Sequence, residues 1–256
     1  MAYASTVLKI TGLTKKYSDN ASVLKGIDIE VKEGEFVIVI GPSGAGKTTF
    51  IRCINRMVEP TEGKIEFNGT DVVALKGDGL RKVRADIGMI FQHYNLIGRT
   101  NVIRNVMHGR LGHSSVFKSL FGGYSTEEKR NAFELLEKVG LSDYIYKKAN
   151  TLSGGQMQRV GICRAMMQDP LLLLADEPIA SLDPKSAKVV MDQIHGIVSE
   201  KNIACIMNLH QVHIAKDYAT RIIGMKGGNV VYDGNPSGLT DELVRIIYEG
   251  ENEDGR

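Results

Sequence analysis

Hydrophobic residues along the chain gather in short runs separated by turn-forming residues. Phe36–Ile40 is a continuous apolar run rich in β-branched residues, which is typical of a central parallel strand covered on both faces. Shorter apolar or alternating runs predict further strands at Leu8–Ile10, Ile27–Val31, Lys64–Phe67, Asp86–Phe91, Leu171–Ala175, Ile203–Met207, Ile222–Met225 and Val230–Val231. The Asn68-Gly69 pair favours a hairpin turn directly after the strand predicted at Lys64–Phe67.

Helical patterns alternate with these strands and then fill the middle of the chain. Helices are predicted at about Lys47–Met57 and Pro184–Ser199, and the pattern from about Asn101 to Met167 is helical without a convincing strand. Within that stretch, Ser125–Glu128 is a capping box that opens an amphipathic helix. The apolar face of this helix comprises Phe133, Leu135, Leu136 and Val139. The sequence therefore predicts an α/β core interrupted by a helical insert of about 70 residues.

Length and charge narrow the class of protein. With 256 residues, of which 43% are hydrophobic and 24% charged, the chain has the size and composition of one large globular domain, with or without a small satellite. The formal net charge is only +2, so we expect no nucleic-acid partner. No apolar run approaches the roughly 18–20 residues that a membrane span requires.

Cysteine usage and the first residues indicate the compartment. Cys53, Cys163 and Cys205 are far apart and form no CxxC pair, which favours buried thiols in a reducing environment. The first ten residues lack the basic and long apolar segments of a signal peptide. We therefore expect an intracellular protein.

A glycine-rich segment carries the first functional signal. Gly41–Thr48 fits the pattern G-x-x-x-x-G-K-[ST], in which glycines let backbone N–H groups turn toward phosphate oxygens. Lys47 can reach the β- and γ-phosphates, and the Thr48 hydroxyl can bind Mg²⁺. An incidental glycine-rich turn is the alternative, but the position between a buried strand and a helix favours a nucleotide site. The predicted phosphate-binding residues are Gly41, Pro42, Ser43, Gly44, Ala45, Gly46, Lys47, Thr48 and Thr49.

Two acids directly follow the leucine-rich strand predicted at Leu171–Ala175. The carboxyl ends of the strands are the edge of an α/β sheet at which ligands bind. Asp176 is suited to hold Mg²⁺, and Glu177 is suited to act as general base toward an attacking water. The alternative interpretation is a strand that ends in two solvated acids without a function. The predicted phosphate cradle nearby favours the functional interpretation. Together the two motifs predict hydrolysis of ATP or GTP.

A third motif precedes the acidic strand and makes a family recognisable. In Leu152–Arg159, LSGGQMQR, Ser153 can cap a helix that starts near Gly155, giving a second helix end suited to anions, or simply a helix cap. The order of the three motifs resembles the ATP-binding cassette (ABC) ATPases. Met157 stands where many members have glutamine, and we expect it to face away from the phosphate-binding residues.

This resemblance implies a fold and a division of the chain. ABC ATPases have an α/β P-loop NTPase core, with a mixed, mainly parallel sheet and an N-terminal antiparallel β part, and carry an inserted α-helical subdomain. In this chain the core would comprise residues 1–97 and 168–256. The helical signature subdomain would comprise residues 98–167, all within a single ABC ATPase domain.

The resemblance also implies roles for individual residues. Tyr17 matches an aromatic that stacks on adenine, and Gln92 a glutamine that senses Mg²⁺ and couples to a membrane partner. His210 matches a histidine that contacts the γ-phosphate, so Glu177, His210 and Gln92 are the implied catalytic residues. Thr48, Gln92 and Asp176 are the implied Mg²⁺ residues. The signature residues implied to bind ATP are Ser153, Gly154, Gly155 and Gln156.

Partners follow from the same resemblance. ABC ATPases pair head-to-tail, sandwiching ATP between the P-loop of one copy and the signature helix of the other, and Ser181–Asp183 matches a loop that crosses this interface. A short chain with a single cassette implies a bacterial importer with separate membrane permease subunits, which in turn bind an extracytoplasmic substrate-binding protein. The expected location is peripheral, on the cytoplasmic face of the inner membrane. The alternative is a non-transport cassette that serves as an assembly module on a soluble complex, such as a phosphonate-degrading enzyme or a ribosome.

Several short sequence segments resemble one subfamily, the phosphonate-import ATP-binding proteins. The matching segments are Asn55–Thr61, Ile87–Leu96, Glu177–Pro184 and Asn208–Val212, with a departure at Arg99–Asn101. The cargo is expected to be phosphonates or related phosphorus oxyanions, although no residue of this subunit would touch it.

A basic stretch follows Gln92 and has two interpretations. Arg99, Arg104, Arg110 and Lys118 form either a docking surface for a cytoplasmic loop of the membrane subunit or a solvated face. Their position just after Gln92 favours docking.

Overall fold

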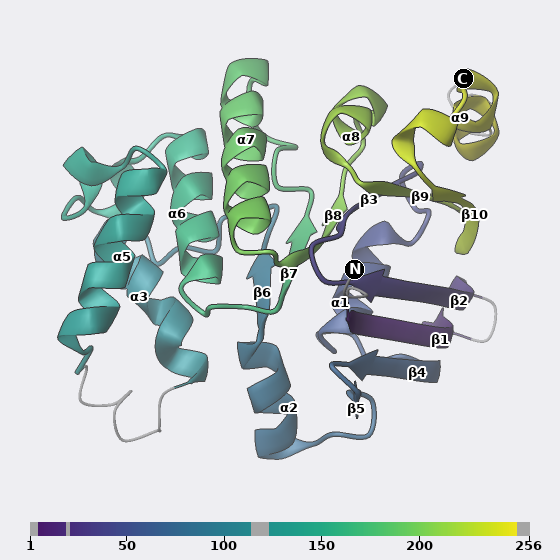
Figure 1. The fold of residues 1–256 in the computed structure, drawn as a ribbon, viewed down its shortest axis with the longest axis horizontal. Helices are drawn as coiled ribbons and strands as arrows, with labels where there is room; N and C mark the ends of the chain where they lie inside the picture. The colour runs from purple at the N-terminus through teal and green to yellow at the C-terminus, as the bar shows by residue number, and fades with distance from the viewer. Residues whose placement is uncertain (1–4, 19–20, 114–122, 250–256) are drawn as a thin grey trace.

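The computed structural model describes residues 5–18, 21–113 and 123–249, and a six-stranded sheet forms its centre (Figure 1). The strand order is β10-β9-β3-β8-β7-β6, with β10 antiparallel to β9 and the other neighbouring pairs parallel. These strands span Phe36–Ile40 (β3), Ile87–Ile90 (β6), Leu172–Asp176 (β7), Ala204–Asn208 (β8), Arg221–Lys226 (β9) and Asn229–Gly234 (β10). The predicted mainly parallel sheet is therefore confirmed.

A second, antiparallel sheet has the order β2-β1-β4-β5. Its strands span Thr6–Lys16 (β1), Ser22–Lys32 (β2), Glu62–Phe67 (β4) and Thr70–Asp71 (β5). Phe67 pairs with Thr70 across Asn68-Gly69, so the predicted hairpin is confirmed. The strands are longer than their apolar centres because polar residues continue the backbone pairing at both ends.

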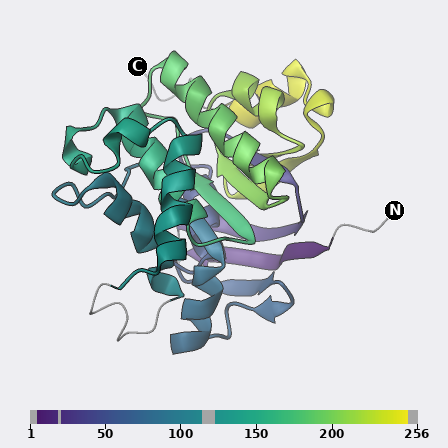
Figure 2. The same cartoon turned by 60° about the vertical axis from the view of Figure 1, so that its left-hand side comes forward.

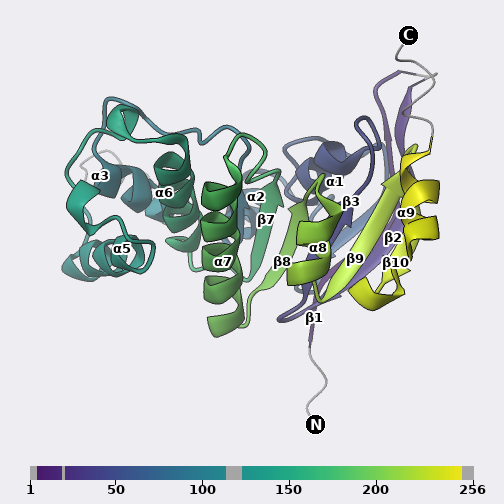
Figure 3. The same cartoon turned by 90° about the horizontal axis from the view of Figure 1, so that it is seen from above.

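Helices cover both the main sheet and one end of the molecule (Figures 2 and 3). The α-helices span Lys47–Ile54 (α1), Gly77–Ala85 (α2), Val102–Met107 (α3), Thr126–Lys138 (α5), Gly154–Met166 (α6), Pro184–Glu200 (α7), Val212–Tyr218 (α8) and Asp241–Tyr248 (α9). Short 3₁₀ helices lie at His108–Gly112, Ser142–Tyr144, Ala149–Thr151 and Pro236–Gly238. Helices α3, α5 and α6 form a lobe at the end of the molecule opposite β1 and β2.

Strand β3 separates two hydrophobic clusters. Phe36, Ile38 and Ile40 belong to a cluster that continues into α3, α5, α6 and α7, whereas Val37 and Val39 belong to one shared with α1 and the antiparallel sheet. Successive side chains of a strand point to opposite faces, so one five-residue strand contributes to both cores. The expectation of a strand covered on both faces is confirmed.

The helical insert agrees with its sequence signals at its best-marked helix. Both hydrogen bonds of the Ser125–Glu128 capping box are present at the start of α5. Of the expected apolar face, Leu136 and Val139 are buried, while Phe133 and Leu135 are partly buried against the core. Ala132 is also buried on this helix.

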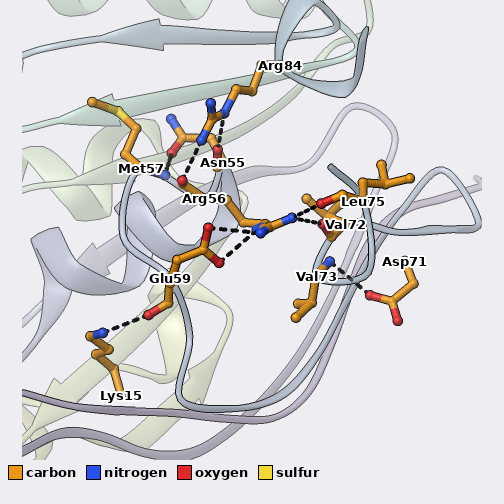
Figure 4. Close-up of polar contacts among 10 residues, drawn as sticks. All are labelled: Lys15, Asn55, Arg56, Met57, Glu59, Asp71, Val72, Val73, Leu75 and Arg84. Carbon is orange, nitrogen blue, oxygen red and sulfur yellow. Dashed lines mark hydrogen bonds and ion pairs between the residues drawn. The ribbon is translucent and has the colours of Figure 1, made fainter. Parts of the chain in front are cut away.

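The helix after the glycine-rich loop ends at Ile54, before the expected Met57. Arg56 lies in the left-handed region with a φ of 53°, which stops the helix. Its guanidinium donates to the carbonyls of Val72 and Leu75 and to the carboxylate of Glu59 (Figure 4). Tertiary contacts of one arginine thus end α1 where the sequence pattern alone would continue it.

Two other expectations differ in detail. Leu171 precedes β7 and is 47% exposed, because strand pairing with β6 and β8 begins only at Leu172. Three short helices, α2, α8 and α9, were not anticipated from periodicity. In the part of the chain that the structure describes, no helix is both long enough and apolar enough to cross a bilayer.

Candidate active site

The loop between β3 and α1 forms a cradle that requires glycine at defined positions. Gly41, Gly44 and Gly46 have φ values of 148°, 76° and 100°, which other residues rarely adopt. A Cβ atom on Gly41 would lie 2.1 Å from the Met225 carbonyl oxygen, and one on Gly46 would lie 2.8 Å from the Val23 carbonyl oxygen. At Gly41 and Gly46 the loop is therefore packed too closely for a side chain, while Gly44 needs glycine for its backbone conformation alone.

Lys47 begins α1 and holds its charge over this loop. Its side chain is almost fully buried, and its Nζ donates to the carbonyl oxygens of Gly41 at 2.6 Å and Pro42 at 3.0 Å. An open cavity of about 430 Å³ lies beside it and is lined by Val23, Ser43–Thr49, Glu177 and His210. The structure thus brings together residues that the sequence analysis assigned to phosphate binding and to hydrolysis.

Asp176 ends β7 in a buried position, only 3% exposed, and is surrounded by donors. Its Oδ1 accepts from the Thr48 hydroxyl at 2.8 Å and from Asn208 Nδ2 at 3.1 Å, and its Oδ2 accepts from Arg52 Nη2 at 3.3 Å. The carboxylate and the Thr48 hydroxyl are neighbouring hard oxygen ligands. This donor set suits Mg²⁺, which is usually held by one or two side chains together with substrate phosphates.

Glu177 and His210 form a contacting pair at the mouth of the cavity. The distance from His210 Nε2 to Glu177 Oε1 is 2.6 Å. The His210 side chain is 41% exposed and the Glu177 side chain is 15% exposed. They meet because β7 and β8 are parallel neighbours, with Asp176 opposite Asn208 at their carboxyl ends. A carboxylate beside an imidazole can accept a proton from a water molecule in the cavity.

Gln92 and Tyr17, which the sequence assigned to Mg²⁺ and adenine, lie outside this cavity. Gln92 is exposed and follows β6, whose Ile90 pairs with Ala175, so it lies at the same edge of the sheet as the acids. Tyr17 follows β1 and is 61% exposed, with Lys15 Nζ 4.9 Å from its ring centroid. Neither residue is among those that line the phosphate cavity.

The signature motif begins α6 in the helical lobe. Ser153 is exposed, its Oγ accepts from the Gln156 backbone N–H at 3.3 Å, and the Gln156 side chain accepts from the Ser153 N–H at 2.9 Å. The predicted cap is therefore confirmed, and Met157 packs partly against the core. Figures 1 and 3 both show α6 apart from α1, with α7 and β7 between them.

Sequence reasoning missed several residues of the site. Arg52 lies one helical turn after Thr48, so the helical period could have placed it near Asp176. Asn208 ends a buried apolar strand at the carboxyl edge, a position that itself signals a ligand site. Val23, by contrast, contributes from a strand of the other sheet, and no local pattern marks it.

Comparison with known proteins identifies this arrangement. Residues 24–180 match the family described as ABC transporter. The chain belongs to the ABC transporter family. Its ABC cassette has a P-loop NTPase fold and acts as an ATPase that binds ATP.

Curated relatives extend the similarity over nearly the whole cassette. The phosphonates import ATP-binding protein PhnC 2 of Oceanobacillus iheyensis is 51% identical over 243 residues, which cover 95% of this chain and 96% of the relative. A protein of the corresponding name from Treponema denticola is 48% identical and covers 93% of each chain.

Solved structures of cassettes share the fold. A dimeric ATP-binding cassette in a post-hydrolysis state, bound to ADP and Pi, superposes with a TM-score of 0.79 at 33% identity and covers 90% of this chain and 98% of its own. A transporter cassette in its ADP conformation gives a TM-score of 0.81 at 28% identity, with 94% and 98% coverage. The predicted P-loop NTPase fold is therefore confirmed.

Proposed function

We propose that this chain is the ATP-hydrolysing subunit of a bacterial ABC importer that takes up phosphonates or related phosphorus oxyanions. The proposal is supported by relatives that carry the name phosphonates import ATP-binding protein at 46–51% identity over most of the chain. The observation that carries the chemical part is the contact between Glu177 and His210 beside the glycine cradle. No second function has a comparable observation in its favour.

The proposed mechanism assigns one task to each part of the site. Backbone N–H groups of the cradle and the Lys47 ammonium bind the β- and γ-phosphates of ATP. Thr48 and Asp176, together with Gln92 after β6, are the residues that would hold Mg²⁺, and the ion would supply positive charge to the phosphates. Glu177 takes the proton of the attacking water, and His210 Nε2 orients the carboxylate and faces the γ-phosphate.

The active unit is proposed to be a head-to-tail dimer. The cradle and the α6 N-terminus both suit phosphate, yet they lie in separate parts of one chain (Figure 1). In a dimer, Ser153–Gln156 of a second copy would complete the ATP site, with Ser181–Asp183 near the interface and Tyr17 against adenine. The dimeric state of a solved cassette with 33% identity supports this arrangement.

Permease subunits are the proposed membrane partners, and an extracytoplasmic binding protein would deliver the cargo to them. We propose residues 1–97 and 168–256 as the nucleotide-binding core, and residues 98–167 as the helical subdomain that meets the permease. Arg99 and Arg104 are exposed and available for docking at the membrane's cytoplasmic face. Arg110 instead lies 3.7 Å from Glu128, and Lys118 lies outside the described residues.

Reconstitution tests the proposal. The full chain, its permease and its binding protein are placed in proteoliposomes, and ATP hydrolysis and uptake of radiolabelled methylphosphonate are measured together. We expect phosphonate to stimulate hydrolysis and Glu177→Gln to abolish uptake. Hydrolysis without any phosphonate-dependent uptake, with the chain recovered on a soluble complex instead, would favour a non-transport cassette.

A further inference from the structure

The hydroxyl of Tyr248, on the C-terminal helix α9, lies between two loops of the ATP site. It accepts a hydrogen bond from the backbone N–H of Gly41 at 3.2 Å and donates to the backbone carbonyl of His210 at 3.4 Å. Gly41 is the first residue of the cradle, and the His210 side chain contacts Glu177. One side chain thus connects the cradle to the loop that carries His210.

Helix α9 is firmly fixed where it presents this hydroxyl. Thr240 caps its start by accepting from the Leu243 N–H at 3.2 Å, and Lys226 Nζ donates to the Ile246 carbonyl at 2.6 Å near its end. Ile247 is only 1% exposed and packs onto β9 so closely that a Cβ on Gly224 would lie 2.6 Å from it. The Tyr248 hydroxyl therefore has a defined position rather than a freely rotating one.

The two loops differ in how much else holds them. Gly41 follows β3, which is paired on both sides, and Lys47 Nζ bonds to its carbonyl. The His210 loop leaves the sheet after Leu209, whose N–H bonds to Val39, and the His210 side chain is 41% exposed. Loss of the Tyr248 hydroxyl should therefore disturb His210 more than the cradle.

We propose that Tyr248 is a positioning residue for ATP hydrolysis. By fixing the His210 backbone relative to Gly41, its hydroxyl holds the imidazole against the Glu177 carboxylate. The inference rests on the roles proposed above for Glu177 and His210. It predicts a lower rate of the chemical step with little change in nucleotide affinity. General destabilisation of the fold would not give this selective effect.

Tyr248→Phe tests the inference because it removes only the hydroxyl. With the full chain, we expect kcat for ATP hydrolysis to fall about three- to tenfold, the range expected for one net hydrogen bond. Affinity for a fluorescent ATP analogue should change less than about twofold, and the melting temperature should stay close to that of the unmodified chain. The matched control is Tyr232→Phe, which removes a hydroxyl bonded to the Asn235 carbonyl at 2.6 Å and should leave kcat unchanged.

A double-variant cycle separates this inference from the proposed roles themselves. If Tyr248 acts through His210, adding Tyr248→Phe to His210→Ala should lower kcat no further. The inference is overturned if Tyr248→Phe lowers kcat in the His210→Ala background by as much as it does alone. It is also overturned if Tyr248→Phe alone leaves kcat unchanged while His210→Ala is impaired. An unimpaired His210→Ala variant would instead overturn the proposed role of His210.

Discussion

Asp176 and Glu177 are adjacent carboxylates with different surroundings. Asp176 is buried and accepts hydrogen bonds from Thr48, Asn208 and Arg52, so its orientation is fixed. Glu177 has a φ of 51°, a backbone conformation that costs energy in most residues and that turns its side chain toward His210. The different surroundings support a metal-binding role for the first acid and a base role for the second.

Glu177→Gln should separate binding from hydrolysis. The amide keeps the size of the side chain but cannot accept the proton of the attacking water, so we expect steady-state phosphate release to fall by at least about 100-fold. ATP binding should persist and a closed dimer should accumulate, which light scattering after size-exclusion chromatography would detect. Glu200→Gln, the same change at an exposed ion pair with Lys138, is the control. Undiminished hydrolysis by Glu177→Gln would contradict its role as base.

The three cysteines should be unreactive in the folded protein. Cys53, Cys163 and Cys205 are free and fully buried, and burial raises the pKa of each thiol, that of Cys53 from 9.0 to about 11. At pH 8 the thiolate fraction of Cys53 then falls roughly 100-fold, in addition to the steric protection. A colourimetric thiol reagent should label none of them quickly in buffer and all three in denaturant. Rapid labelling of the native chain would contradict the burial.

Residue identities at the site were predictable where chemistry requires a particular side chain. The glycines, Lys47, Asp176 and Glu177 could be chosen because phosphate and Mg²⁺ demand those groups in that order. Tyr248 could not, because its contact with Gly41 joins positions 207 residues apart and uses only backbone atoms of the partner. Contacts of side chains with distant backbone leave no pattern in the sequence.

At the level of elements, the end of α1 shows how tertiary contacts replace local signals. Arg84 from α2 donates to the carbonyls of Asn55 and Arg56, which follow the last turn of α1 (Figure 4). Lys15 from β1 donates to the Glu59 carbonyl in the same region. The helix that carries the cradle is thus fixed at its far end to both α2 and the antiparallel sheet.

Arg56→Met should destabilise the protein through this region. The guanidinium is largely buried and donates to the Val72 and Leu75 carbonyls, which the substitution would leave without that donor. We expect the free energy of unfolding in urea to fall by about 2–3 kcal/mol. Lys82→Met on the exposed side of α2 is the control and should change it by less than about 0.5 kcal/mol. Equal unfolding midpoints for the two variants would show that the Arg56 contacts contribute little.

Elements were predictable where hydrophobic burial sets their period. The buried run Phe36–Ile40 and the capped helix α5 carry strong signals, since their packing follows directly from residue spacing. Helix α9 has eight residues and is held by Lys226 and by the space that Gly224 leaves. Such a short helix is stabilised mainly by the surface on which it packs, so its own sequence predicts it poorly.

On the scale of the whole molecule, the helical lobe and the main sheet share one hydrophobic cluster. Buried residues of α3, α5 and α6 and those on one face of β3 and β7 belong to the same cluster. The sequence predicted the insert from its loss of strand pattern. It could not predict the shared core, because which faces meet depends on the packing of distant segments.

Arg104→Glu should weaken docking to the permease. Arg104 is exposed on α3, and reversal of its charge would oppose an acidic partner surface, so we expect roughly tenfold less permease to co-purify with the chain at low salt. Arg130→Glu is the control, since Arg130 is exposed on α5 beside Glu134. Equal recovery with both variants would favour a solvated face over a docking surface.

The strand order has a consequence for synthesis on the ribosome. Strand β3, which leads into the phosphate cradle, lies between β8 and β9, and both of these are encoded late in the chain. The cradle therefore emerges from the ribosome long before its neighbouring strands exist, and Tyr248 emerges later still. A nascent cassette cannot complete its ATP site until β8, β9 and the loop that carries His210 have been synthesised, so we expect no ATP hydrolysis by a shorter nascent chain.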